Sequence, residues 1–217
     1  METVDRQKLK NIIFDYGNVI FEIDFKRAQQ AFLELGIRNV EEFFAHKAHH
    51  QLFNDFETGH LSSAAFRDGI RAAAGNPDIA DGIIDDAWNS LLVGVPGPEV
   101  HDTLLEVKAK YRTFLLSNTN DIHYKQILEH LMTSFHVPDN NHLFEKTYYS
   151  QQMLLRKPDV AIFERVLKEN DLDPQETLFI DDSPQHIEGA KKAGLHTLLM
   201  DRNPKYLREF LVEHGIL

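Results

Sequence analysis

Short apolar runs alternate with longer amphipathic stretches over most of the chain. The runs lie at 11–16, 113–116, 177–180 and 197–200, with a weaker one at 147–150. Uninterrupted runs of this length are typical of strands buried on both faces of a parallel sheet. Between them, apolar residues recur at helical spacing at 99–109, 122–131, 159–170, 187–193 and 206–212. The alternation predicts an α/β fold with a doubly wound, Rossmann-like parallel sheet.

The stretch from residue 23 to residue 96 has a different pattern. It shows helical spacing and no strand pattern, and the spacing predicts that its last helix, around Trp88, continues through Leu91 and Leu92. A Gly- and Pro-rich cluster at 94–98 ends it. We therefore predict that residues 23–96 form an inserted helical segment and that residues 1–22 and 97–217 form the sheet domain.

Composition narrows the possible classes of function. The 217 residues contain no cysteine, which excludes a disulfide scaffold, a thiolate metal site and a cysteine nucleophile. The formal net charge of -11 disfavours broad nucleic-acid binding. No run approaches the length of a membrane span, and the N-terminus has no signal-like apolar region. We expect a cytoplasmic protein without nucleic-acid or membrane partners, as a monomer or a weak homodimer.

Polar side chains follow three of the predicted strands where each strand ends. Asp15 follows the first, Ser117 and Asn118 the second, and Asp181 and Asp182 the third. Lys157 precedes a predicted helix. Because ligands of open parallel sheets bind outside the carboxyl ends of the strands, we expect these groups to converge there.

This set of groups suits phosphate chemistry. Clustered carboxylates repel one another unless a cation lies among them, and oxygen ligands favour Mg²⁺. Asp15 can attack phosphorus to form an aspartyl-phosphate, while Lys157 and Ser117 stabilise the phosphoryl oxygens. Taken singly, Asp15 is a turn residue and Asp181–Asp182 a helix cap. The combination favours a site.

Four motifs in order carry a resemblance to a known family. They are Phe14-Asp15-Tyr16-Gly17-Asn18-Val19, Leu115-Leu116-Ser117-Asn118-Thr119, Arg156-Lys157-Pro158-Asp159 and Phe179-Ile180-Asp181-Asp182-Ser183. The chain resembles the haloacid dehalogenase-like (HAD) hydrolase superfamily, with residues 23–96 in the place of a C1-type cap. Within it, the chain is most similar to a sugar-phosphatase branch that includes bacterial α-D-glucose-1-phosphate phosphatases. Asp24 and Glu57-Thr58-Gly59 also look like that branch.

The resemblance implies a Mg²⁺-dependent phosphatase of small phosphomonoesters, above all sugar phosphates such as glucose 1-phosphate. It assigns the following roles to residues of this chain: Asp15 as nucleophile and metal ligand, the Gly17 carbonyl and Asp182 as further ligands, Asp181 as a ligand directly or through water, and Ser117, Asn118 and Lys157 as phosphate-binding residues.

Gly17 departs from the family pattern. Most phosphatases of the family have a second Asp at this position, which acts as general acid and base, and its loss typically costs about 10²–10⁴-fold in rate. Three explanations stay open: a slower enzyme, a substrate with an easy leaving group, or an acid supplied by the cap. His49, His50 and Glu57 are candidates for that acid. His46, His49 and His50 also have zinc-like spacing, but we expect an exposed polar face there.

Three alternative functions follow from the same residues. A phosphosugar mutase needs the acid–base residue that Gly17 replaces. A catalytically weak module that binds a phosphorylated ligand or a protein partner is compatible with Gly17. A haloacid dehalogenase also uses an Asp nucleophile but no metal, and the Asp181–Asp182 pair speaks for a metal.

Overall fold

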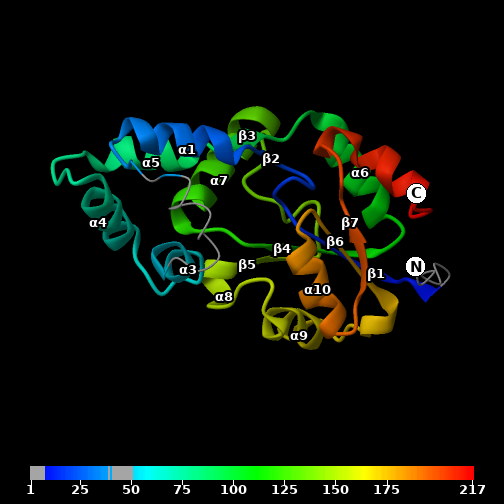
Figure 1. Ribbon diagram of the computed structural model, residues 1–217. Coiled ribbons are helices and arrows are strands. Elements are labelled where there is room, and N and C mark those ends of the chain that lie inside the picture. Colours follow the sequence, from blue (N-terminus) through cyan, green and yellow to red (C-terminus); the bar gives the residue numbers. More distant parts are fainter. Residues whose placement is uncertain (1–7, 39, 41–50) are drawn as a thin grey trace.

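A five-stranded parallel sheet forms the centre of the molecule (Figure 1). The computed structural model describes residues 8–38, 40 and 51–217. The strand order is β5-β4-β1-β6-β7. The strands are β1 (Asn11–Phe14), β4 (Arg112–Ser117), β5 (Lys146–Tyr149), β6 (Thr177–Asp181) and β7 (His196–Leu199). Every neighbouring pair is parallel, and Phe14 lies opposite both Leu115 and Ile180. The predicted parallel sheet is confirmed.

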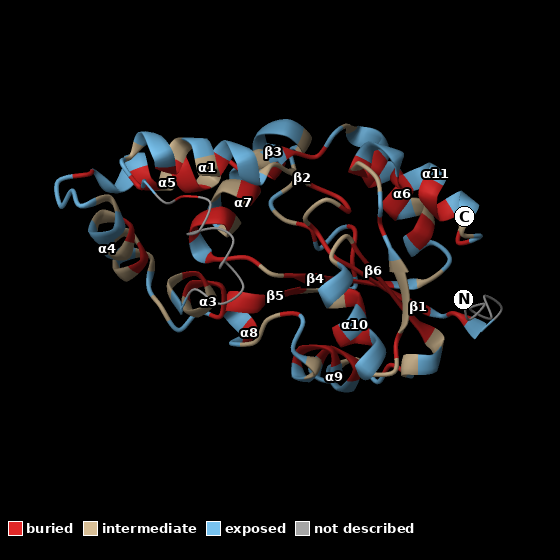
Figure 2. Ribbon diagram, viewed as in Figure 1, coloured by how far each residue is buried: buried red, intermediate tan, exposed pale blue. Residues whose placement is uncertain are grey.

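Helices cover both faces of this sheet, and side chains alternate between the faces along each strand. Ile12 and Phe14 of β1 pack with α6 (Pro98–Lys108), α7 (Asp121–Phe135) and α11 (Leu207–Glu213). Ile13 packs on the other side with α9 (Val160–Glu169) and α10 (Pro184–Lys192). The short helix α8 (Ser150–Met153) and 3₁₀ turns at Pro174–Glu176 and Pro204–Tyr206 complete this part. Figure 2 shows β1, β4 and β6 as buried over most of their length, whereas the edge strand β7 is of intermediate burial. This burial explains the apolar runs of the three central strands.

The predicted cap segment, residues 23–96, has its own apolar core. Its helices are α1 (Phe25–Glu34), α3 (Gln51–Glu57), α4 (Ser63–Ala74) and α5 (Asp81–Asn89). Trp88 is fully buried at the centre, with its ring centroid 5.2 to 5.9 Å from those of Phe32, Phe53 and Phe66. The side chains of Asp24 and Ser62 cap the first turns of α1 and α4.

Helix α7 of the sheet domain packs against the apolar core of the cap segment. Its His123 stacks on Trp88 with the ring centroids 4.4 Å apart. Nε2 of His123 lies 3.1 Å from the Trp88 carbonyl oxygen, and Ile122 joins the apolar cluster of the cap segment.

The prediction of a purely helical segment is wrong at its two ends. The strands β2 (Glu22–Ile23) and β3 (Leu92–Gly94) pair antiparallel there, and α5 ends at Asn89 instead of continuing through Leu91 and Leu92. Strands this short show too few residues for an alternating pattern to be recognised. The pairing joins the two points where the chain enters and leaves the cap segment.

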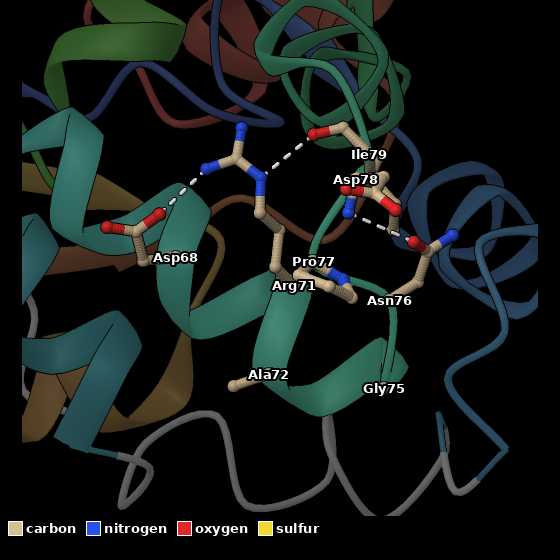
Figure 3. A pocket seen from close by; sticks show the side chains of 8 residues that line it. All are labelled: Asp68, Arg71, Ala72, Gly75, Asn76, Pro77, Asp78 and Ile79. Atoms are coloured by element: carbon tan, nitrogen blue, oxygen red, sulfur yellow. Dashed lines mark hydrogen bonds and ion pairs between the residues drawn. The ribbon is translucent and has the colours of Figure 1, made fainter.

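The cap segment also carries an open groove of about 680 Å³ at the far end of the molecule from both termini (Figures 1 and 3). Its one guanidinium, that of Arg71, donates to the Ile79 carbonyl oxygen at 2.8 Å and to Asp68 at 2.7 Å, and it also contacts Asp81. Because these partners already engage Arg71, the groove offers little for catalysis. Among the described residues, none of the helices has the length and apolar character to cross a membrane.

Neighbouring isoleucines of α5 test the packing of the cap segment. Ile84 is fully buried whereas Ile83 is 52% exposed. We expect Ile84→Ala to lower the free energy of unfolding by about 2–5 kcal/mol, because it leaves a cavity in the aromatic core. The matched control Ile83→Ala is expected to change it by about 0.5 kcal/mol or less. Urea denaturation followed by the fluorescence of Trp88 measures both, and equal losses would contradict the packing described.

Candidate active site

The polar residues predicted from the strand ends meet at the carboxyl edge of the sheet. Asp15 follows β1, and its backbone N–H donates to the Ile180 carbonyl oxygen of β6 at 2.9 Å. The order of the strands reverses beside β1, since β4 and β5 lie to one side and β6 and β7 to the other. A crevice outside the strands forms at such a reversal, which is where parallel sheets bind ligands.

The ammonium of Lys157 forms ion pairs with carboxylates at the ends of two adjacent strands, β1 and β6. Its ammonium lies 2.6 Å from Oδ1 of Asp15 and 2.7 Å from Oδ2 of Asp181, and its side chain is fully buried. Asn118 fixes the backbone on which Lys157 sits: its Nδ2 donates to the Lys157 carbonyl oxygen, and its Oδ1 accepts from the Lys157 N–H, both at 2.9 Å. Four residues from distant parts of the chain thus share one network.

His186 belongs to this network, although the sequence interpretation did not include it. Its Nδ1 lies 2.9 and 3.0 Å from the two carboxylate oxygens of Asp181. Oδ1 of Asp181 also accepts from the Ser183 N–H at 2.8 Å. Both oxygens of Asp181 are therefore engaged by protein groups. The one signal in the sequence was the position of His186 in the first turn and a half of the helix that follows Asp181.

Asp182 faces the loop after β1. Asn18 has a left-handed backbone, with φ of 54°, and its Nδ2 donates to Oδ2 of Asp182 at 3.1 Å. Oδ1 of Asn18 accepts from the Ile23 N–H at 3.0 Å. A Cβ on Gly17 would lie 3.1 Å from Cδ1 of Ile23, so a larger residue at position 17 requires Ile23 to shift slightly.

The electrostatics of the site leave negative charge uncompensated. Burial raises the pKa of Asp15 well above its usual range, and Asp181 raises it further, while Lys157 acts in the opposite direction. The pKa of Asp182 is raised for the same two reasons, burial and Asp181. Burial would lower the pKa of Lys157, but Asp15 and Asp181 raise it overall. One cation thus faces three carboxylates.

This donor set fits a hard divalent cation. The ligand atoms of Asp15, Asp181 and His186 lie within 4.8 Å of one another. However, Lys157, Ser183 and His186 already engage the Asp181 carboxylate, whereas among the described residues only the Asn18 amide donates to that of Asp182. Carboxylate and carbonyl oxygens are the ligands that Mg²⁺ prefers, and a cation among them would restore ordinary pKa values.

A small cavity of about 70 Å³ lies beside these groups. Gly17, Ser117, Asn118 and Thr119 line it from the sheet domain, and Glu57 lines it from the cap segment. The rest of its wall comes from Tyr16, Phe21, Ile23, Phe25, Leu91, Leu92, His123 and Ile127. His46, His49 and His50 lie outside the described residues, so of the three candidate acids only Glu57 has a described position.

Comparisons with known proteins identify the family of this chain. The model of the family "Haloacid dehalogenase-like hydrolase" matches residues 89–200. The chain is 30% identical to a D-ribitol-5-phosphate phosphatase of Bacteroides thetaiotaomicron, over 94% of this chain and 98% of that protein. The chain belongs to the haloacid dehalogenase-like hydrolase family.

Solved structures of this HAD family extend the likeness to the fold. A HAD family enzyme of B. thetaiotaomicron in complex with magnesium and inorganic phosphate is 37% identical, with a TM-score of 0.80, and 92% of this chain and 98% of that chain are covered. A predicted HAD-like hydrolase of Porphyromonas gingivalis is 28% identical with a TM-score of 0.81, covering 96% and 98%. The predictions of a HAD-like enzyme and of its α/β fold are confirmed.

The raised pKa of Asp15 predicts a pH-dependent affinity for Mg²⁺. Because a metal binds the carboxylate and not the carboxylic acid, protons compete with Mg²⁺ as the pH falls below this raised pKa. We expect the affinity to fall by up to about tenfold per pH unit in that range, with proton release on binding. Isothermal titration calorimetry in two buffers of different ionisation heat measures both effects.

The control for this titration is Asp15→Asn, which removes one of the two carboxyl groups with a raised pKa and should reduce the proton release to the part that comes from Asp182. An affinity in the unaltered protein that does not change between neutral and mildly acidic pH would contradict the prediction.

Proposed function

We propose that this protein is a Mg²⁺-dependent phosphatase that hydrolyses small sugar or alditol phosphates through an aspartyl-phosphate intermediate. The observation that carries the proposal is the buried Lys157, whose ammonium bridges Asp15 and Asp181 beside a cavity lined by Ser117 and Asn118. A buried cation next to a carboxylate at the carboxyl edge of the sheet, with hydrogen-bond donors nearby, suits a transferring phosphoryl group. In this proposal residues 23–96 are the cap, and residues 1–22 and 97–217 are the catalytic core.

The first step forms and breaks one bond at phosphorus. A carboxylate oxygen of Asp15 attacks the phosphorus, and the bond from phosphorus to the ester oxygen breaks. The Lys157 ammonium, the Ser117 hydroxyl and the Asn118 side chain or nearby backbone hold the phosphoryl oxygens. Asp15, the Gly17 carbonyl and Asp182 are the residues that would hold Mg²⁺, which supplies positive charge opposite the phosphoryl oxygens when bound.

The second step returns the enzyme to its starting state. Water attacks the phosphorus of the aspartyl-phosphate, the bond between the Asp15 oxygen and phosphorus breaks, and inorganic phosphate leaves. Asp181 contributes by holding Lys157 in place, since its own oxygens are already engaged. The cap segment covers the cavity and excludes bulk water.

The leaving group needs a proton when it is an alkoxide, and Gly17 cannot supply one. In the cavity, Glu57 is the ionisable residue of the cap segment with a described position. Solvent is the other source. Glu57 and solvent are therefore both proton donors in this proposal.

Two substrates represent the proposed class. The relative from B. thetaiotaomicron is a D-ribitol-5-phosphate phosphatase, and its substrate is a linear alditol ester. The resemblance in the motifs instead favours glucose 1-phosphate, whose leaving group departs more readily. The family relationship supports a small hydroxylated phosphate ester in general, and a panel that contains both compounds and p-nitrophenyl phosphate ranks them.

Substitution of the nucleophile tests the proposal. We expect Asp15→Asn to reduce phosphate release by about 10³-fold or more, because the attacking carboxylate is lost. Release by the unaltered protein should also require Mg²⁺ and stop in EDTA. Asp102→Asn, the same chemical change on the exposed surface of α6, serves as the control.

A folded, Mg²⁺-binding protein that releases no phosphate from any substrate would instead favour a phosphate-binding module. Phosphate release that is unaffected by EDTA would favour a metal-independent activity.

Introducing a carboxyl group at position 17 tests whether the absence of a general acid there limits kcat. Gly17 does not have a left-handed backbone, and a Cβ there meets only Ile23. We therefore expect Gly17→Asp, combined with Ile23→Val to make room, to raise kcat on an alkyl phosphate by about 10²-fold. Gly17→Asn with Ile23→Val has the same shape but no transferable carboxyl proton. If the two double variants have equal kcat values, an acid at position 17 does not limit this enzyme.

A further inference from the structure

Glu57 is a buried acidic residue that takes no part in the bond changes at phosphorus. It is the last residue of α3 and is 6% exposed. It lines the same cavity as Gly17, Ser117 and Asn118. Since Ser117 and Asn118 are the proposed phosphate-binding residues, Glu57 faces the space that the leaving group of a substrate would fill.

The position of Glu57 is set by the sheet domain. Its Oε2 lies 3.0 Å from Nη2 of Arg156, whose side chain is only 18% exposed. Arg156 also donates from Nη1 to Oδ1 of Asn54, one turn earlier in α3, at 3.4 Å. Arg156 immediately precedes Lys157, whose backbone is bonded to Asn118 in both directions. The Glu57 carboxylate is therefore fixed relative to the phosphate-binding residues through a short chain of contacts.

The chemistry of the cavity favours one kind of leaving group. A carboxylate accepts hydrogen bonds from hydroxyl groups and repels other carboxylates. Another part of the wall is apolar and comes from Ile23, Phe25, Leu91 and Leu92. Such a wall suits the C–H groups of a sugar or alditol chain.

We propose that Glu57, held by Arg156, is the specificity-determining residue of this site: it accepts hydrogen bonds from the hydroxyl groups of a neutral, polyhydroxylated leaving group and excludes leaving groups that carry a carboxylate. This inference rests on the proposed phosphatase function and adds the charge and hydroxylation of the substrate. It assigns no proton transfer to Glu57.

The test compares kcat/KM for two classes of substrate in Glu57→Gln. Ribitol 5-phosphate and glucose 1-phosphate represent neutral hydroxylated leaving groups, and 2-phosphoglycolate and 3-phosphoglycerate represent carboxylated ones. The glutamine keeps the shape of the side chain and an oxygen that accepts from Arg156, so the contact between α3 and the sheet domain is retained. Glu188→Gln, the same change at an exposed position of α10, is the control.

We expect Glu57→Gln to lower kcat/KM for the neutral substrates by about tenfold, mainly through KM, because a charge-assisted hydrogen bond becomes a neutral one. For the carboxylated substrates we expect a rise of about tenfold, because a like-charge repulsion disappears. The ratio of the two classes should therefore fall by about 100-fold, while Glu188→Gln leaves it unchanged.

Two outcomes would overturn the inference. An unchanged ratio, or an equal loss for all substrates together with a lower melting temperature, would show that Glu57 only holds the cap segment against Arg156. Failure of the proposed function is recognised separately, because p-nitrophenyl phosphate would then show no phosphate release that depends on Asp15.

Discussion

The buried ammonium of Lys157 is the interaction on which the site depends. A lysine without solvent contact is costly to bury, and the cost is offset only if carboxylates lie close and the remaining hydrogen bonds are made. Asp15 and Asp181 satisfy both conditions from two adjacent strands. The same contacts hold the end of β1, the end of β6 and the loop before α9 together, so the charge balance of the site also fixes the geometry of the sheet edge.

Much of this arrangement could be predicted from the sequence because it follows from short apolar runs. Each buried parallel strand can be recognised by its short apolar run, and the polar residue at the end of that run must lie at the carboxyl edge of the sheet. Asp15, Ser117 and Asp181 were therefore placed correctly relative to the sheet. The position of Lys157 follows less directly from the sequence, since it lies in a loop before a helix and no strand end fixes it; the family motif supports the same placement.

Other features depend on contacts between segments that are distant in the chain, and the sequence carries little signal for them. The ion pair of Glu57 with Arg156 joins the end of α3 to the loop before α9, about a hundred positions further along the chain, and neither residue has a pattern that indicates it. His186 looks like an ordinary polar residue in the first turns of a helix. The pairing of β2 with β3 involves too few residues to show an alternation, and Leu92 has the same apolar character in a strand as in a helix.

Helix α7 contacts both the carboxyl edge of the sheet and the aromatic core of the cap segment. It therefore limits how independently the sequences of these two parts can change. The Asn120 side chain caps α7 directly after the proposed phosphate-binding residues, and His123, one turn later, stacks on Trp88 of the cap segment. A change in the aromatic core that moves Trp88 therefore also bears on the loop that holds Ser117 and Asn118. During the evolution of new substrate preferences, the apolar residues that line the cavity, such as Phe25 and Leu92, are free to vary. The aromatic packing around Trp88 must keep its shape if the segment that carries Ser117 and Asn118 is to stay in place.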